Sequence, residues 1–179
     1  MFYWDGTQWI AVDARQPRMA YGGALIRFAA YVIDSFIIGI PLGILFVVLA
    51  IAGVVASPVA PSDLAPPPPG GTAMGSFQLS PAAIFSFYLF GLLVAAAYYI
   101  SFWGTSGATL GMRLFELRVV DAKTLQPIGI GRAILRYVGF VIAALPCWIG
   151  LIWAAFDQRS QGWHDKIAST VVLQPRAAQ

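Results

Sequence analysis

Residues 22–56 read GGALIRFAAYVIDSFIIGIPLGILFVVLAIAGVVA, a long apolar run with two charged side chains near its start. A bilayer core about 30 Å thick is crossed by roughly 20 apolar residues in a helix, so this run predicts a spanning helix over about 24–56. Arg27 and Asp34 lie two helical turns apart and project from nearly one face, with Tyr31 between them. Charged groups in a membrane helix cost about 2.5–3.5 kcal/mol and rarely face lipid. We therefore expect both charges to have partners elsewhere, and Asp34 to be the residue most important for function.

The composition is that of an integral membrane protein. Hydrophobic residues make up 59% of the 179 and charged residues 11%, with a net charge of +3 and a mean hydropathy of +0.74. A chain of this length can hold one small membrane domain. The basic residues are not grouped with base-stacking side chains, so we expect no nucleic-acid binding. The prediction is an all-α membrane protein whose partner is the lipid bilayer.

Charge and turn residues divide the rest of the chain. Residues 57–81 are rich in proline and lack Lys and Arg, which predicts an outer loop and a cytoplasmic N-terminus by the positive-inside rule. Residues 82–103 have no formal charge and predict a second spanning helix. Residues 104–131 form a polar cytoplasmic connection, with a strand expected at 117–121. The polar and aromatic residues 1–21 predict a cytoplasmic segment, either an interfacial anchor or a small hairpin turning at Asp5-Gly6, and 175–179 form a tail.

The third apolar segment, residues 132–156, leaves two alternatives open. Lys and Arg are clustered before the first predicted helix, between the second and third, and after the third. The positive-inside rule places all three clusters in the cytoplasm, but three full spans would put the last cluster outside. Pro146 can break the segment into a re-entrant hairpin, or the segment spans once with a kink. We favour the single kinked span.

Three ordered motifs carry a family resemblance: LIRFAAYVID at 25–34, GATLGMRLFELRVVD at 107–121 and QGWHDKIASTVVL at 161–173. Together they resemble the RDD family, small bacterial membrane proteins named for one Arg and two Asp, over about residues 20–174. FYWDGTQW, at residues 2–9, resembles half of a short Trp-rich motif of bacterial membrane proteins. The RDD resemblance implies location in a bacterial plasma membrane and, in general terms, a transport role.

The resemblance also selects residues. Arg27 matches the family Arg and Asp34 the first Asp, while the second is Asp157 or Asp165, of which Asp165 is favoured. Met112 stands where the family usually has Lys, with Arg113 beside it.

The remaining candidate residues follow from position. Arg136 sits near the inner edge of the third segment and is the partner that we predict for Asp34. Arg113 and Arg118 are expected at the membrane surface, where they can meet anionic lipid. His164 is expected there too, as a juxtamembrane hydrogen-bond donor, with Asp165 near one of these two arginines.

Two function classes remain. The first is a small secondary transporter of a cation or proton, with a network of charged and polar residues: Arg27, Tyr31, Asp34, Arg136, Asp157 and Asp165. The alternative is a non-catalytic membrane scaffold or partner-binding subunit, in which these charges join helices. In both, three helices enclose little volume, so we expect a homo-oligomer. The single His and single Cys do not supply a metal or nucleophile set, so we expect no enzyme activity, metal or cofactor.

Overall fold

The computed structural model describes the backbone of residues 2–4, 9–11, 18–52, 56–58, 77–146 and 149–176. It divides the chain into two compact units, which we describe separately. Unit 1 contains residues 1–33 and 99–179, and unit 2 contains residues 34–98. Unit 1 is therefore built from both ends of the sequence, with unit 2 inserted between them.

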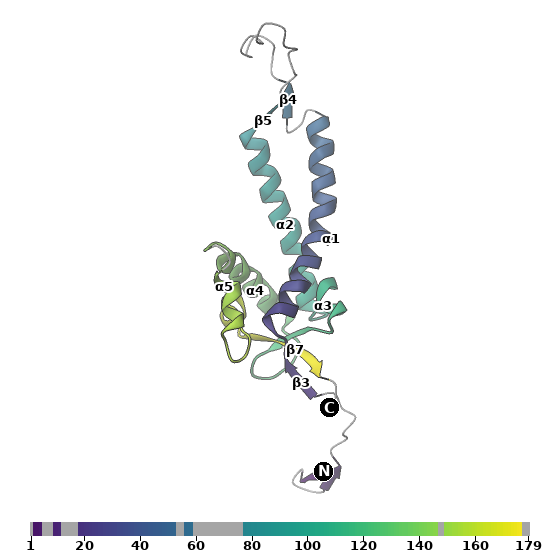
Figure 1. The fold of residues 1–179 in the computed structure, drawn as a ribbon, viewed down its shortest axis with the longest axis vertical. Coiled ribbons are helices and arrows are strands. Elements are labelled where there is room, and N and C mark those ends of the chain that lie inside the picture. The colour runs from purple at the N-terminus through teal and green to yellow at the C-terminus, as the bar shows by residue number, and fades with distance from the viewer. Residues whose placement is uncertain are drawn as a thin grey trace. The chain divides into compact units, whose positions relative to one another are not determined.

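Unit 2 consists of the C-terminal part of one long helix, the N-terminal part of a second, and a pair of short strands between them in sequence. Helix α1 runs over Ala24–Ile51 and α2 over Pro81–Thr105, and the strands β4 (Ala56–Pro58) and β5 (Phe77–Leu79) pair antiparallel at their tip (Figure 1). Both helices are long and apolar enough to cross a membrane, as the sequence predicts. Gly91 lets α2 approach Leu42, where an added Cβ would lie 3.6 Å from the leucine methyl.

Helix α1 ends earlier than predicted, at Ile51 rather than near residue 56. Ala56–Pro58 is a strand instead. Pro58 disfavours the helical region at Ser57, the residue before it, in agreement with this strand.

Unit 1 contains a three-stranded antiparallel sheet that an all-α prediction leaves out, although helices dominate the chain. Its order is β3 (Arg18–Tyr21), β7 (Thr170–Arg176), β6 (Arg118–Asp121), with β7 in the centre. The strand predicted at 117–121 is thus present, but its partner is Thr170–Leu173. Val119 and its register partner Val172 are buried on one face of this sheet, and Val171, on the other face, is buried too.

Short helices complete unit 1. They are α3 (Leu110–Leu114), α4 (Gly129–Ala144), α5 (Ile149–Ile152), the 3-10 turn η2 (Trp153–Ala155) and α6 (Trp163–Ile167). Two glycines permit close packing: a Cβ on Gly139 would lie 3.0 Å from the His164 Cα, and one on Gly150 would lie 2.7 Å from the Ala143 Cβ. The backbone at the N-terminus also pairs as a hairpin, with Trp4 opposite Trp9, in agreement with the hairpin alternative.

The third apolar segment is broken. Helix α4 and the α5–η2 pair are bent by 115° relative to each other. Among the described residues, two helices are long and apolar enough to cross a membrane, or three if the bent pair is counted as one. Helix α4 has 16 residues, about 24 Å at 1.5 Å per residue, which is shorter than a 30 Å bilayer core. A break of this kind occurs both in a broken span and in a re-entrant loop, so the single kinked span and the re-entrant hairpin both stay predictions.

Candidate functional site

The site in unit 1 is organised around the carboxylate of Asp165. Helix α6 begins after Gly162, whose extended backbone leaves its N–H pointing back along the first turn. The Asp165 Oδ2 atom accepts this N–H at 2.9 Å, which is how an acidic residue at the third helical position caps a helix. Asp165 is completely buried, so its charge must be balanced from within the protein.

Two buried arginines supply that balance from two other helices. Arg27 of α1 donates to Asp165 Oδ2 and to the Ser160 carbonyl oxygen. Arg136 of α4 donates to Asp165 Oδ1 and to the Thr170 hydroxyl at the start of β7. One carboxylate therefore joins α1, α4, α6 and, through Thr170, the central strand. We call Arg27, Arg136, Asp165 and Thr170 the clasp.

The clasp carries two positive charges and one negative charge without exposure to solvent. Burial by itself raises the pKa of Asp165, but Arg136 and Arg27 outweigh it and hold that pKa well below its usual range. Asp165 thus stays ionised at any ordinary pH. The Arg136 guanidinium also lies over the indole of Trp103, 4.8 Å from the ring centre, which lowers the cost of burying the second cation.

His164 packs against the clasp. Its Nε2 lies 3.3 Å from the Tyr31 hydroxyl oxygen and 3.4 Å from Arg27 Nη2, and its ring stands edge-on to Phe140. Burial, aided by Arg136 and Arg27 and opposed by Asp165, lowers the pKa of His164 to about 3. Because Arg27 can only donate, a neutral His164 receives this hydrogen bond at Nε2 and carries its proton on Nδ1. The juxtamembrane position predicted for His164 stays a prediction, and its ring is buried in the core of unit 1.

Several polar atoms of this core have no hydrogen-bond partner among the residues that the structure describes. They are Nε and Nη2 of Arg136, Nε1 of Trp103 and Nδ1 of His164. Such atoms are costly to bury. For Arg136 the Trp103 ring face offers partial compensation, which a hydrogen-bond count does not include.

Asp34 belongs to unit 2 and has a different environment. It is fully buried and accepts a hydrogen bond from the Tyr98 hydroxyl of α2, with 2.7 Å between the two oxygens. From sequence, the position of Tyr98 beside Tyr99 and near Trp103 at the end of the predicted helix 82–103 indicates only an aromatic belt at the membrane surface. The predicted pairing of Asp34 with Arg136 stays a prediction, while the carboxylate found on Arg136 is Asp165.

Of the predicted residues, the structure brings Arg27, Tyr31, Arg136, His164 and Asp165 together. Asp157 is elsewhere: its carboxylate pairs with the half-exposed Lys166 at 2.6 Å and accepts the Arg159 and Gln161 N–H groups. The hydrogen bond from Lys166 lowers the pKa of Asp157 despite the opposing effect of desolvation.

The expectation that Asp165 lies near Arg113 or Arg118 is wrong, because Arg27 and Arg136 occupy both of its oxygens. Sequence reasoning also missed Thr170 and Trp103. Thr170 lies within the 161–173 motif, which assigns it no role, and Trp103 is buried on α2 one turn after the buried Tyr99.

In the described ranges, no group of three or more His, Cys, Asp and Glu side chains is placed to hold a metal ion. The arrangement can do two things chemically. The clasp can lock helices together, and the Asp34–Tyr98 hydrogen bond can join α1 to α2.

Comparison with known proteins gives a consistent family. The RDD family model matches residues 21–169. An uncharacterized protein of Rickettsia prowazekii (strain Madrid E), RP437, is 34% identical over 82 residues, 46% of this chain and 45% of that protein. A proline-rich antigen of Mycobacterium leprae (strain TN) is 32% identical over 92 residues, 48% of this chain and 36% of that protein.

A third relative covers more of both chains. The uncharacterized protein YxaI of Bacillus subtilis (strain 168) is 28% identical over 156 residues, 84% of this chain and 95% of that protein. The matches to the first two relatives span less than half of their lengths. No solved structure matches. With a family match over most of its length, including all of the clasp residues but Thr170, this chain belongs to the RDD family.

Proposed function

We propose that this chain is a non-catalytic membrane subunit, in which the charges of Arg27, Arg136 and Asp165 join the helices of unit 1. The observation that carries the proposal is the Asp165 carboxylate, which binds Arg27 of α1 and Arg136 of α4 at once. Both oxygens are occupied, and the pKa of Asp165 lies well below its usual range. A carboxylate held in this way is suited to joining helices and poorly suited to exchanging protons.

The neighbouring imidazole supports the same conclusion. With its pKa lowered to about 3 by burial and the two arginines, His164 is neutral at physiological pH and has no proton to give at Nε2. The titratable groups of unit 1 that a transporter would use are thus fixed in one charge state.

A second candidate function, transport of a proton or small cation, is favoured by Asp34. A buried carboxylate in a membrane helix is costly and is by default a functional-site hypothesis, and the Tyr98 hydroxyl donates a hydrogen bond to Asp34. A path beyond it is harder to build from one copy, because residues 84–98 of α2 offer only Ser86, Tyr88 and Tyr98 as polar groups. Transport would therefore require a homo-oligomer that lines the path with several copies.

For either function, we place the chain in a bacterial plasma membrane with its N-terminus in the cytoplasm and more than one crossing. The support is the distribution of Lys and Arg, which are absent from residues 28–112. Cysteine labelling at position 62 and at position 123, each with an impermeant reagent on intact cells, tests this orientation. Labelling at 62 and protection at 123 are expected, and the opposite pattern refutes it.

One experiment separates the two functions: ion-driven proton flux in proteoliposomes containing wild type, Asp34→Asn, Tyr98→Phe or the control Asp157→Asn. A scaffold gives no flux above empty vesicles in any of the four proteins. Flux in wild type and in the Asp157 variant that disappears in a folded Asp34→Asn protein would refute the scaffold and establish transport. Flux that survives in Asp34→Asn would remove that carboxylate from the mechanism.

A further inference from the structure

A pocket of about 620 Å³ opens in unit 1, and none of the four clasp residues lines it. Its charged lining residues are Arg113 of α3, Glu116 after α3, and Arg118 of β6. Among the residues that the structure describes, none of these three forms an ion pair. The pocket thus presents two unneutralised cations and one unneutralised anion.

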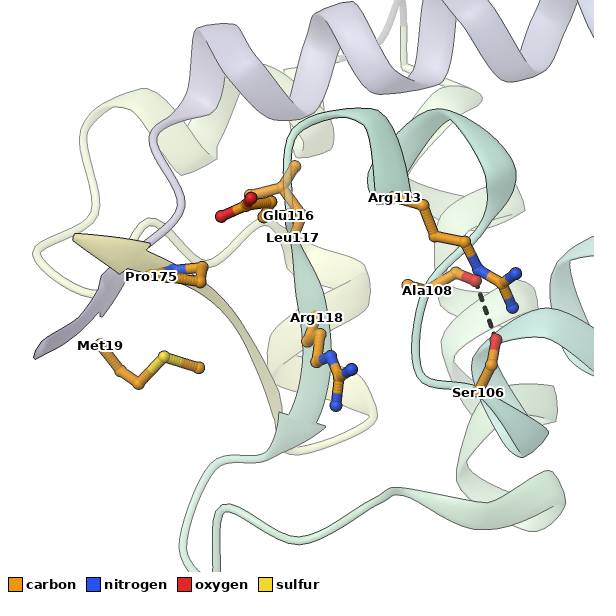
Figure 2. Close-up of a pocket in the computed structure, with 8 residues that line it drawn as sticks. All are labelled: Met19, Ser106, Ala108, Arg113, Glu116, Leu117, Arg118 and Pro175. Carbon is orange, nitrogen blue, oxygen red and sulfur yellow. Dashed lines mark hydrogen bonds between the residues drawn. The ribbon is translucent and has the colours of Figure 1, made fainter. Parts of the chain in front are cut away.

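The charges are separated within the pocket. Figure 2 shows the Arg113 and Arg118 guanidinium groups on the side of Ser106, whereas the Glu116 carboxylate points toward the side of Pro175. Arg113 is held by stacking on Phe102, with its guanidinium carbon 5.5 Å from the ring centre. An occupant that matches this pattern carries a negative group at one end and a positive group at the other.

The backbone at Glu116 is unusual for the residue found there. Helix α3 ends with the Glu116 N–H bonded to the Arg113 carbonyl and the Leu117 N–H bonded to the Met112 carbonyl, a Schellman arrangement. Glu116 occupies its left-handed position, with φ of 56°, where glycine is the usual residue. A carboxylate at a position that disfavours any side chain indicates that the side chain has a use.

The surroundings of the pocket suit a lipid. Leu114 and Leu110 flank Arg113 on α3 and are exposed, Leu114 by 69%. Exposed leucines beside an arginine on a short helix are typical of an element that lies in the membrane interface. The wall formed by Met19, Leu117 and Pro175 adds apolar surface to the same pocket.

We propose that this pocket binds a phosphate ester that bears an ammonium group, as in a phosphoethanolamine headgroup. The phosphate lies between Arg113 and Arg118, because guanidinium groups match phosphate oxygens. The ammonium lies at the Glu116 carboxylate. The same chemistry occurs in a membrane phospholipid and in free phosphoethanolamine, and the exposed leucines favour the lipid.

The test uses the full-length protein in detergent micelles and two phospholipids labelled on the acyl chain, phosphatidylethanolamine and phosphatidylglycerol. Wild type should bind the ethanolamine lipid more tightly. Arg118→Gln should weaken binding of both lipids by about fivefold, the effect of one interfacial cation. Glu116→Gln should remove the preference between them and leave phosphatidylglycerol binding unchanged or stronger. Lys123→Gln is the matched control, since it removes a cation of the same connection that does not line the pocket.

Two results would overturn the proposal. Equal binding of both lipids by wild type would remove the ammonium site. An equal loss with Lys123→Gln and Arg118→Gln would show diffuse attraction to the surface rather than a pocket. Free phosphoethanolamine distinguishes the two sources: failure to displace the lipid at millimolar concentration supports the lipid, and full displacement shows a soluble ligand of the same chemistry. Circular dichroism of each variant shows whether a loss of binding reflects unfolding. Glu116→Gly is a second substitution that removes the carboxylate, and glycine adopts the left-handed backbone at the end of α3 without strain.

Discussion

Replacing Asp165 with Asn should be the most damaging conservative substitution in the chain. The amide has nearly the same shape as the carboxylate but no charge, so it leaves Arg27 and Arg136 buried without their anion. Removing one partner of a buried ion pair costs about 3–5 kcal/mol, and here one carboxylate serves two cations. Since proteins are stable by only about 5–15 kcal/mol, we expect Asp165→Asn to lose a third or more of its free energy of unfolding.

The assay is denaturant unfolding in detergent micelles, followed by tryptophan fluorescence. Asp157→Asn is the matched control, because its partner Lys166 is half exposed and such pairs contribute about 1 kcal/mol or less. Adding Arg136→Met to the Asp165→Asn protein should restore part of the lost stability by removing one orphaned cation. If Asp165→Asn unfolds at the same denaturant concentration as Asp157→Asn, the clasp does not hold unit 1 together.

Three further predictions concern packing, capping and pH. Gly150→Ala should destabilise by about 1–3 kcal/mol, because its Cβ would overlap a neighbouring alanine, whereas Gly131→Ala, in open space within α4, should be neutral or slightly stabilising in the same unfolding assay. Thr109→Ala should lower the free energy of unfolding by about 1 kcal/mol, because the buried Thr109 hydroxyl accepts the Met112 N–H at 3.2 Å and caps α3. Ser80→Ala should lower it by less, since the exposed Ser80 hydroxyl accepts the Ala83 N–H at 3.4 Å. Equal losses in the two variants would contradict the capping role of Thr109. The pKa of His164 is lowered to about 3 in the folded state, whereas an unfolded histidine takes up a proton near pH 6.5. The contribution of His164 to the free energy of unfolding is therefore complete above pH 6.5. Below pH 6.5 that free energy falls by up to about 1.4 kcal/mol per pH unit. His164 is the only histidine, so His164→Gln should flatten the unfolding free energy between pH 6.5 and 4, and an unchanged slope would place the titrating group elsewhere.

Local composition was enough to predict the membrane helices. The uncharged run at 82–103 and the apolar run from Gly22 each indicate a membrane helix without reference to the rest of the chain, because hydropathy is calculated from neighbouring residues. Strand Arg118–Asp121 was also recognisable from its alternating β-branched residues. The other strands of its sheet were not recognisable from a local pattern. Strands β3 and β7, for example, pair Arg18 with Arg176, which lie at nearly opposite ends of the chain. Such pairing is set by tertiary packing rather than by a local pattern.

The candidate site was partly predictable for a similar reason. The cost of a charge in an apolar helix indicates that Arg27 needs a partner, but it does not identify which one. Asp165 follows a polar stretch and looks exposed in sequence, and only the burial of α6 against α4 brings it to the arginines. The aromatic neighbours of Tyr98 in the sequence indicate an aromatic belt, whereas in the structure its hydroxyl donates a hydrogen bond to Asp34.

The separation of the clasp residues along the chain also fixes an order of events during synthesis. Arg27 precedes Asp165 by 138 residues, and ribosomes add about 5–20 residues per second. Its counter-charge is therefore made roughly 7–28 s later, after the whole of residues 34–98 has left the ribosome. During that interval the hairpin can enter the bilayer while Arg27 remains unneutralised. A ribosome that stalls before residue 165 leaves both arginines without an anion, so a chain that is incomplete differs electrostatically from a finished one.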